Sequence, residues 1–521
     1  MRAVKSINYQ VVKKVIIGLL LLLAAIFLVA SKYKLTHFKD SQIDEILFYF
    51  NNGIVGGKTD NFWEIAIKNL PLAILLFIII MLPVINKTWI LIKRGVDRVI
   101  NMTFPKTEKA FPLIQLHRKL TYAAVLFFIS FALLLQSFGV PAYASSLINS
   151  TKLYEEHYVD PKTVGLTFPA KKRNLIYIFL ESMENTVASK ANGGQSETSL
   201  IPELEELALK NTSFSHRQTG LGGAAPTSGT GFTVGGITAQ SAGVPLKENV
   251  LGRDRNSMGI LNNFLPGAYT LGDILKQQGY NQTFLMGSEA AFGGRSKLLT
   301  QHGGYTVKDH PYAQQHQKIP SDYKVFWGYE DKKLFQFAKE EATELAKSDK
   351  PFNLQLLTID THFTDGYLDE TCAKTFANQY DNVHACSSKQ VADFIAWVQN
   401  QPFYDNTTIV LSGDHLGMQT SYYDQKITDA NYQRTIYNAF INSATTAKKT
   451  HNRQMTTLDM YPSTLAALGV KIDGDRLGLG TNLFSDKQTL SEQLGGVNNL
   501  SSELSKRSEF YEKRIFSQPK H

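Results

Sequence analysis

Three long apolar runs occupy the first quarter of the chain, and shorter apolar segments alternate with polar ones beyond it. The runs cover residues 15–30, 70–85 and 120–135, and none contains a charged residue. With its flanks each run reaches the ~20 residues that a membrane-spanning helix needs. We therefore expect an N-terminal bundle of three transmembrane helices, near 15–31, 68–86 and 120–138.

Basic residues predict how these helices are oriented. Residues 87–119 carry eight Lys or Arg and only two Asp or Glu, which makes this segment cytoplasmic by the positive-inside rule. Basic residues also precede the first run; a cleaved signal peptide would share that pattern, but no small-residue cleavage site follows. Three crossings then place everything after about residue 138 outside the membrane, and the amphipathic segment 41–56 is expected to lie at the interface.

Net charge and cysteine content bear on the possible partners and on the compartment of the protein. The net charge of +8 and pI near 9.0 are compatible with nucleic-acid binding, but the basic residues near the N-terminus flank apolar runs and are better explained by topology. We expect no nucleic-acid partner. The two cysteines, Cys372 and Cys386, would form a short-loop disulfide in an oxidising compartment, in agreement with an extracytoplasmic domain.

From about residue 174 the chain alternates buried strands with helical segments. We expect strands at 174–180, 281–286, 352–359, 407–411 and 437–441, and helices at 271–278, 388–399 and 456–468. Such alternation is typical of an α/β sheet with helices on both faces. The predicted organisation is an anchor over 1–138, a linker over 139–170, a catalytic domain over 171–484 and a polar C-terminal tail over 485–521.

Candidate chemistry lies where these strands end. Glu181 follows the first strand, His362 the third, and the pair Asp414-His415 the fourth. Ligands of open α/β sheets bind beyond the carboxyl ends of the strands. A carboxylate at the end of a buried strand needs a partner, and a divalent cation supplies one. The alternative is an N-cap aspartate beside a surface histidine.

A glycine-rich stretch over 219–245 offers hydroxyl groups instead of charges. It lacks the Gly-Lys-Ser/Thr of a P-loop, so it does not indicate nucleotide binding. It is either a flexible loop or a backbone able to approach an anion closely. Its threonine hydroxyls are weak nucleophiles until a base or a metal activates them.

Three motifs in order carry a family resemblance. The string Gly229-Thr-Gly-Phe-Thr-Val-Gly-Gly-Ile-Thr-Ala-Gln-Ser-Ala-Gly-Val-Pro245 resembles the nucleophile segment of the bacterial phosphoglycerol transferases of the sulfatase and alkaline phosphatase superfamily. Glu181-Ser182 and Gly413-Asp-His-Leu-Gly417 match two further family motifs, and 457–469 looks like its late helix. The resemblance covers roughly residues 170–480. It implies a sulfatase/alkaline-phosphatase-like sheet flanked by helices.

The resemblance also implies a metal site and a nucleophile. One divalent ion, Mn, Mg or Zn, would be held by Glu181, Thr230, Asp414 and His415. Thr230 is selected as the nucleophile by its distance before the Gly-x-Pro, with Thr227 and Thr233 as competing candidates. Arg295 looks like the residue that pairs with phosphate, and His362 like the one that transfers a proton.

The implied reaction moves a phosphoglycerol group from phosphatidylglycerol to an extracytoplasmic glycan or glycerophosphate polymer, through a covalent phosphothreonine. The enzyme would be a multi-pass protein of the bacterial inner membrane, closest to the transferases that decorate periplasmic glucans. Phosphoethanolamine transfer, phosphodiester hydrolysis and a non-enzymatic binding role remain alternatives. Sulfate-ester hydrolysis is not expected, because nothing matches the Cys/Ser-x-Pro-x-Arg motif.

Overall fold

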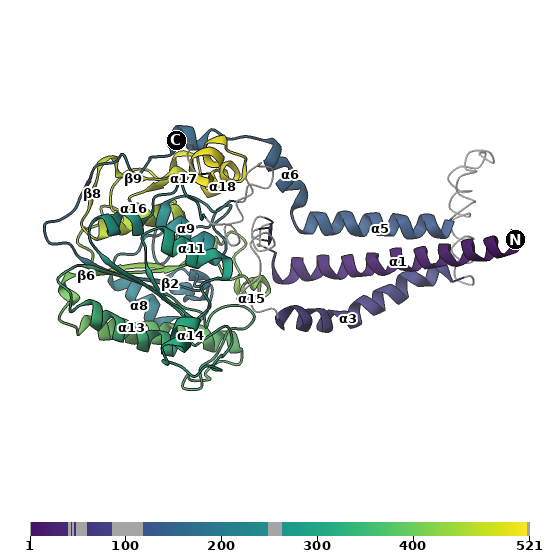
Figure 1. Cartoon of the computed structure of the whole chain (residues 1–521), viewed down its shortest axis with the longest axis horizontal. Coiled ribbons are helices and arrows are strands. Elements are labelled where there is room, and N and C mark those ends of the chain that lie inside the picture. Colours follow the sequence, from purple (N-terminus) through teal and green to yellow (C-terminus); the bar gives the residue numbers. More distant parts are fainter. Residues whose placement is uncertain are drawn as a thin grey trace. The chain divides into compact units, whose positions relative to one another are not determined.

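The computed structural model describes residues 2–39, 43, 46–47, 60–85, 118–247 and 263–517 (Figure 1). The chain divides into two compact units, one formed by Met1–Lys39 with Lys58–Ala142 and the other by Asp40–Gly57 with Tyr143–His521. The predicted interfacial helix over 41–56 lies almost wholly outside the described residues. So does most of the basic segment over 87–119.

In the part of the N-terminal unit that the structure describes there are three long apolar helices: α1 (Arg2–His37), α3 (Asp60–Met81) and α5 (Arg118–Ser137). Within the described residues, three segments are long and apolar enough to cross a membrane: Val11–His37, Ile65–Val84 and Lys119–Ser137. α1 packs against α3 and α5 through a small core that includes Leu21 and Ala123. These helices confirm the three predicted apolar segments.

The second unit is built on a six-stranded sheet with the order β4-β3-β5-β2-β6-β7. The strands are β2 (Asn174–Leu180), β3 (Asn281–Met286), β4 (Thr306–Lys308), β5 (Phe352–Leu357), β6 (Thr407–Gly413) and β7 (Asn438–Ile441). Only β7, paired with β6, runs antiparallel. Short antiparallel pairs join β1 (Leu166–Thr167) to β8 (Lys471–Ile472) and β9 (Arg476–Leu477) to β10 (Gly480–Thr481).

Helices cover both faces of this sheet, as Figure 1 shows. The helices that follow the three long apolar ones along the chain are α6 (Val140–Ile148), α7 (Leu153–His157), α8 (Pro202–Lys210), α9 (Thr233–Ala242), α10 (Leu271–Gln277), α11 (Arg295–Gln301), α12 (His310–Gln315), α13 (Asp331–Leu345), α14 (Gln379–Gln399), α15 (Thr420–Lys426), α16 (Met460–Ala467), α17 (Leu490–Gln493) and α18 (Val497–Ser505). Shorter helical turns are η1 (Leu82–Val84), η3 (Asn185–Val187), η4 (Lys190–Asn192), η5 (Phe292–Gly294), η6 (Tyr404–Asn406), η7 (Thr457–Asp459), η8 (Asp473–Asp475) and the π-helical turn Tyr511–Phe516.

The central strand β2 shows why two layers of helices form. Because successive side chains of a strand point to opposite faces, Tyr177 and Phe179 join a core with α9, α10 and α16. Ile176 and Ile178 join a second core with α8, α13 and α14. A strand buried on both sides reads as the continuous apolar run seen in the sequence. The structure confirms the predicted α/β architecture.

The C-terminal segment differs from the prediction of a polar tail over 485–521. Its described part forms α17, α18 and the π-helical turn, and its apolar side chains enter the main core. Leu500 and Leu504 are buried one turn apart on α18. Their helical spacing is hidden in a sequence that is otherwise polar. The predicted linker over 139–170 also contributes to the domain, since Leu153 and Tyr154 are buried in the same core.

Candidate metal and nucleophile site

Three predicted metal ligands meet beyond the ends of two neighbouring strands. β2 and β6 are paired in parallel up to Leu180 and Gly413, so the residues that follow, Glu181 and Asp414, emerge side by side. Together with His415 they are fully buried, and one ligand atom from each lies within 4.8 Å of the others. Among the described residues this is the one group of three or more such side chains close enough to hold a metal.

The atoms of this group are arranged as a cation would require. His415 Nδ1 donates to the Leu416 carbonyl at 2.7 Å, which leaves Nε2 facing the cluster. Nε2 lies 3.4 Å from Glu181 Oε1 and 3.4 Å from Asp414 Oδ2. Asp414 Oδ2 is buried and has no hydrogen-bond partner. Such an orphaned oxygen is costly unless a cation pairs with it, and two carboxylates with one imidazole suit Mn, Mg or Zn.

In the absence of a metal, the three side chains of this group shift one another's pKa values. Burial disfavours the His415 cation, but the carboxylates of Asp414 and Glu181 outweigh it and raise the His415 pKa to about 10. Burial and repulsion from Glu181 raise the pKa of Asp414 to about 8. Burial also disfavours the Glu181 anion, yet attraction to His415 lowers the Glu181 pKa to about 2. A dication would take over the role of the imidazolium.

Backbone N–H groups hold the second carboxylate oxygen of Asp414, Oδ1. Asp414 Oδ1 accepts the N–H of Ser182 at 2.9 Å and of His415 at 2.8 Å. Ser182 Oγ donates to Glu181 Oε1 at 2.9 Å. Asp414 is therefore oriented through Oδ1, while its Oδ2 is left toward the cluster.

The hydroxyl of Thr233 completes the group. Thr233 is the first residue of α9, and its Oγ1 lies 3.4 Å from Glu181 Oε2 and 3.3 Å from His415 Nε2. α9 can approach because Gly236 has no side chain: a Cβ there would come within 2.0 Å of the Asp414 carbonyl oxygen. Gln240, one turn further, donates to the Gly413 carbonyl at 3.0 Å and holds the helix on the end of β6.

Thr230, the predicted nucleophile, lies in a local turn of the chain. Its Oγ1 accepts the Thr227 N–H at 2.8 Å and donates to the Thr227 carbonyl at 3.0 Å, which closes a local turn. This geometry favours Thr233, one of the competing candidates, over Thr230 as the nucleophile and hydroxyl ligand. The missed signal was the start of the helix, since Val234 and Ile237 repeat at helical spacing from Thr233 onward.

His362 and Arg295 are the candidates for proton transfer and phosphate binding. His362 follows β5, and its Nδ1 donates to the Phe363 carbonyl at 2.7 Å. Burial lowers the His362 pKa to about 4; Glu181 opposes this shift, whereas the charges of His415 and Arg295 reinforce it. Arg295, buried at the start of α11, donates to the carbonyls of Phe292 at 3.1 Å and Glu289 at 2.8 Å. His362 is thus within electrostatic reach of Glu181, and Arg295 within reach of His362.

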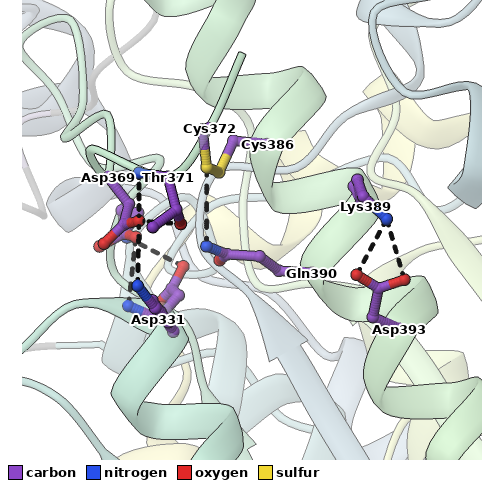
Figure 2. The surroundings of a disulfide bond; sticks show 10 residues. Asp331, Asp369, Thr371, Cys372, Cys386, Lys389, Gln390 and Asp393 are labelled. Carbon is purple, nitrogen blue, oxygen red and sulfur yellow. Dashed lines mark hydrogen bonds and ion pairs between the residues drawn. A yellow bond between two sulfur atoms is a disulfide. The ribbon is translucent and has the colours of Figure 1, made fainter.

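The predicted disulfide forms between Cys372 and Cys386, whose Cα atoms lie 5.7 Å apart. Figure 2 shows that it ties α14 to the loop after β5, close to Asp369 and Thr371. His362 lies on the same loop, ten residues before Cys372.

The fold is that of the alkaline phosphatase and sulfatase class of α/β enzymes. Residues 173–470 match the family model described as Sulfatase, and the chain belongs to this family.

Named relatives are similar over part of their length. Phosphoglycerol transferase I of Shigella flexneri is 31% identical over 349 residues, which cover 65% of this chain and 42% of that protein. The protein of the same name from Escherichia coli O127:H6 is 32% identical over 277 residues, 51% of this chain and 34% of the relative. The chain therefore spans less than half the length of these curated relatives. Among solved structures, the lipoteichoic acid synthase LtaP from Listeria monocytogenes is 18% identical with a TM-score of 0.46, covering 62% of this chain and 79% of that one.

Proposed function

We propose that the chain is a membrane-anchored, metal-dependent phosphotransferase that moves a phosphoglycerol group from phosphatidylglycerol to an acceptor hydroxyl. The observation that carries this proposal is the Thr233 hydroxyl, 3.3 Å from His415 Nε2 and 3.4 Å from Glu181 Oε2 at the start of a buried helix. The similarity to proteins named phosphoglycerol transferase I supports the transferred group.

The proposed location is the bacterial inner membrane, with the catalytic domain on the periplasmic or extracellular side. Three helices long and apolar enough to span a membrane support the anchor. The disulfide supports the outer side, because disulfides persist in oxidising compartments and are rare in the cytosol. An anchored domain would meet its lipid donor at the membrane surface, and the acceptor would be a glycan or a glycerophosphate polymer.

The residues of the site have distinct proposed tasks. Glu181, Asp414 and His415 would hold one divalent ion, which when bound favours the alkoxide form of a nearby hydroxyl and stabilises charge on a phosphoryl oxygen. Thr233 Oγ1 attacks the phosphorus and displaces diacylglycerol, leaving glycerophosphoryl-threonine. The N-terminal end of α9 favours negative charge at this position.

Proton transfer and phosphate binding fall to the two neighbouring residues. His362 donates through Nδ1 to a backbone carbonyl, so its Nε2 is the nitrogen that can accept a proton from the acceptor hydroxyl. The lowered pKa of His362 keeps it neutral, as a base must be. Arg295, buried at the start of α11, would pair with phosphate oxygens through its guanidinium.

The test compares donors and threonines together. Detergent-purified protein is incubated with phosphatidylglycerol or phosphatidylethanolamine and with Mn, Mg or Zn, and diacylglycerol release is measured. We expect release from phosphatidylglycerol that is lost in Thr233→Ala and kept in Thr233→Ser and Thr230→Ala. Diacylglycerol release from phosphatidylethanolamine alone would show that this lipid, and not phosphatidylglycerol, is the donor. Glycerophosphate released into water would indicate a phosphodiesterase. No release with any lipid or metal would refute the transferase.

A further inference from the structure

A second buried acidic residue lies three positions beyond Glu181 and is not part of the metal cluster. Glu184 is completely buried and forms a two-point ion pair with Arg434: Nε reaches Oε1 at 3.0 Å and a terminal nitrogen reaches Oε2 at 2.6 Å. Removing two charges from water costs free energy that the pair itself often fails to recover. A role beyond stability is therefore worth seeking in what else the pair contacts.

The pair holds both sides of Gly417. The Gly417 N–H donates to Glu184 Oε2 at 2.8 Å, and Arg434 donates to the Gly417 carbonyl at 2.7 Å. Gly417 closes the Asp414-His415-Leu416 segment that carries two of the three metal ligands. The pair thereby links the segment after β2, the segment after β6 and the chain that leads into β7.

The contact reaches His415 through a single peptide group. The N–H held by Glu184 belongs to the peptide between Leu416 and Gly417, and the carbonyl of that same peptide accepts His415 Nδ1 at 2.7 Å. Because a peptide group is planar, fixing its N–H also fixes the direction of its carbonyl. That carbonyl places the imidazole proton on Nδ1 and turns Nε2 toward Glu181 and Asp414.

Packing leaves this peptide no freedom to turn. A Cβ on Gly417 would come within 2.0 Å of the Tyr423 ring, so the ring lies directly against the glycine. The Arg434 guanidinium lies over the same ring, 4.6 Å from its centroid. Tyr423 thus supports both Gly417 and the arginine that holds its carbonyl.

We propose that Glu184 and Arg434 are positioning residues for the metal ligand His415, acting through the Leu416–Gly417 peptide. This inference rests on the metal site of the proposed function and deepens it. Neither residue contacts the reacting atoms; together they set which imidazole nitrogen faces the cation and in which direction.

The test is metal affinity of the full-length protein in detergent, measured by calorimetric titration with Mn²⁺ alone. Glu184→Gln keeps the side-chain shape but replaces one oxygen by an NH₂, which must then face either Gly417 and Arg434 or Thr186 and Arg434, all of which donate. Loss of a group that orients a metal-bound histidine typically weakens metal binding about 10- to 100-fold, and we expect that loss here. Saturating metal should restore diacylglycerol release.

A matched control lies elsewhere in the domain. Glu492 pairs with the buried Arg453 at 3.1 Å and also accepts a backbone N–H, that of Gln454, at 3.2 Å. Glu492→Gln should lower thermal stability while leaving the Mn²⁺ affinity unchanged. Arg434→Lys, which keeps the charge but loses the two-point geometry, should weaken Mn²⁺ binding in the same direction and covers the case in which Glu184→Gln does not fold.

Equal Mn²⁺ affinity in wild type, Glu184→Gln and Arg434→Lys would overturn the inference, as would an equal loss in Glu492→Gln. A wild type that binds Mn²⁺ but releases no diacylglycerol would refute the proposed transferase while the affinity comparison still decides the role of Glu184. A wild type that binds no metal would refute both.

Discussion

Two groups of buried carboxylates lie beyond the strand ends of one sheet, and they are neutralised differently. In the first, after β2 and β6, Asp414 Oδ2 and His415 Nε2 face each other without a hydrogen bond. In the second, Asp331 at the start of α13 meets Asp360 after β5. The two oxygens of Asp331 accept the N–H groups of Ile359 at 2.8 Å and Asp360 at 3.2 Å, and Asp360 Oδ2 accepts the Asp331 N–H at 3.1 Å.

Among the described residues only the first group brings three possible ligand side chains together, whereas the second has two carboxyls and no histidine. Burial, reinforced by repulsion from Glu181 and Glu330, raises the pKa of Asp331 to about 7. Burial and repulsion from Asp331 raise the pKa of Asp360 well above its usual value. What separates the groups is the imidazole, whose proton is fixed away from the cluster by a backbone carbonyl. Clustered acidic residues alone do not predict a metal site.

The largest difference in Mn²⁺ affinity is expected between the variants Asp414→Asn and Asp360→Asn. Asp414→Asn removes a proposed ligand, so Mn²⁺ affinity and head-group transfer should fall by more than the roughly 100-fold that loss of a ligand-orienting group can cost. Asp360→Asn imitates a protonated carboxyl and should leave the Mn²⁺ affinity unchanged. Calorimetric titration of both variants provides the measurement, and similar losses in the two would erase the distinction.

The next largest effect is expected on stability, when the disulfide in the loop after Asp360 is removed. The Cys372–Cys386 disulfide closes a loop with a sequence separation of 14, and the loop-entropy relation gives about 3 kcal/mol of unfolding free energy for a loop of this length. Replacing both cysteines by serine should lower stability by that amount in urea unfolding. Reduced wild type is the control and should behave like the variant; a variant as stable as oxidised wild type would contradict the expectation.

Asp331→Asn should change how stability depends on pH. Because folding raises the pKa of Asp331 from 3.8 to about 7, its contribution to stability is fully present below pH 3.8 and is lost as the pH rises through about 7. Asparagine does not titrate. The melting temperature of metal-free wild type relative to the variant should therefore fall across this window, whereas a constant difference between the two proteins would show that Asp331 is not perturbed.

The smallest effect is expected at a surface pair beside the disulfide. Lys389 lies 3.0 Å from Asp393 on the exposed face of α14 (Figure 2). Exposed pairs of this spacing on a helix contribute about 0.3–0.5 kcal/mol. Asp393→Asn should change the urea unfolding free energy by no more than that, and a larger loss would indicate that α14 depends on surface charge.

The sequence predicts the parts of this molecule that have a strong local pattern. The strand over 174–180 is correct to the residue because a strand buried on both faces is a continuous apolar run. β4, with three residues, is too short to show a pattern. α9 was missed because its two glycines disfavour a helix, and its burial against β6 stabilises it instead.

The residues of the candidate site also fall into those that the sequence predicts and those that it does not. Glu181, Asp414 and His415 could be identified because they lie close to the ends of predicted strands and within motifs that match the family. The choice between Thr230 and Thr233 depends on where α9 begins, which motif spacing does not settle. Glu184, after β2, and Arg434, before β7, are 250 residues apart, and the pairing of both strands with β6 brings them together.

Thr233 is the residue that we propose carries the covalent intermediate. The most direct measurement is peptide mass spectrometry of acid-quenched wild type, Thr233→Ala and Thr230→Ala after incubation with phosphatidylglycerol and metal. We expect a glycerophosphate adduct on Thr233 in wild type and Thr230→Ala, and none in Thr233→Ala. An adduct on Thr230, or one that persists in Thr233→Ala, would contradict the proposal.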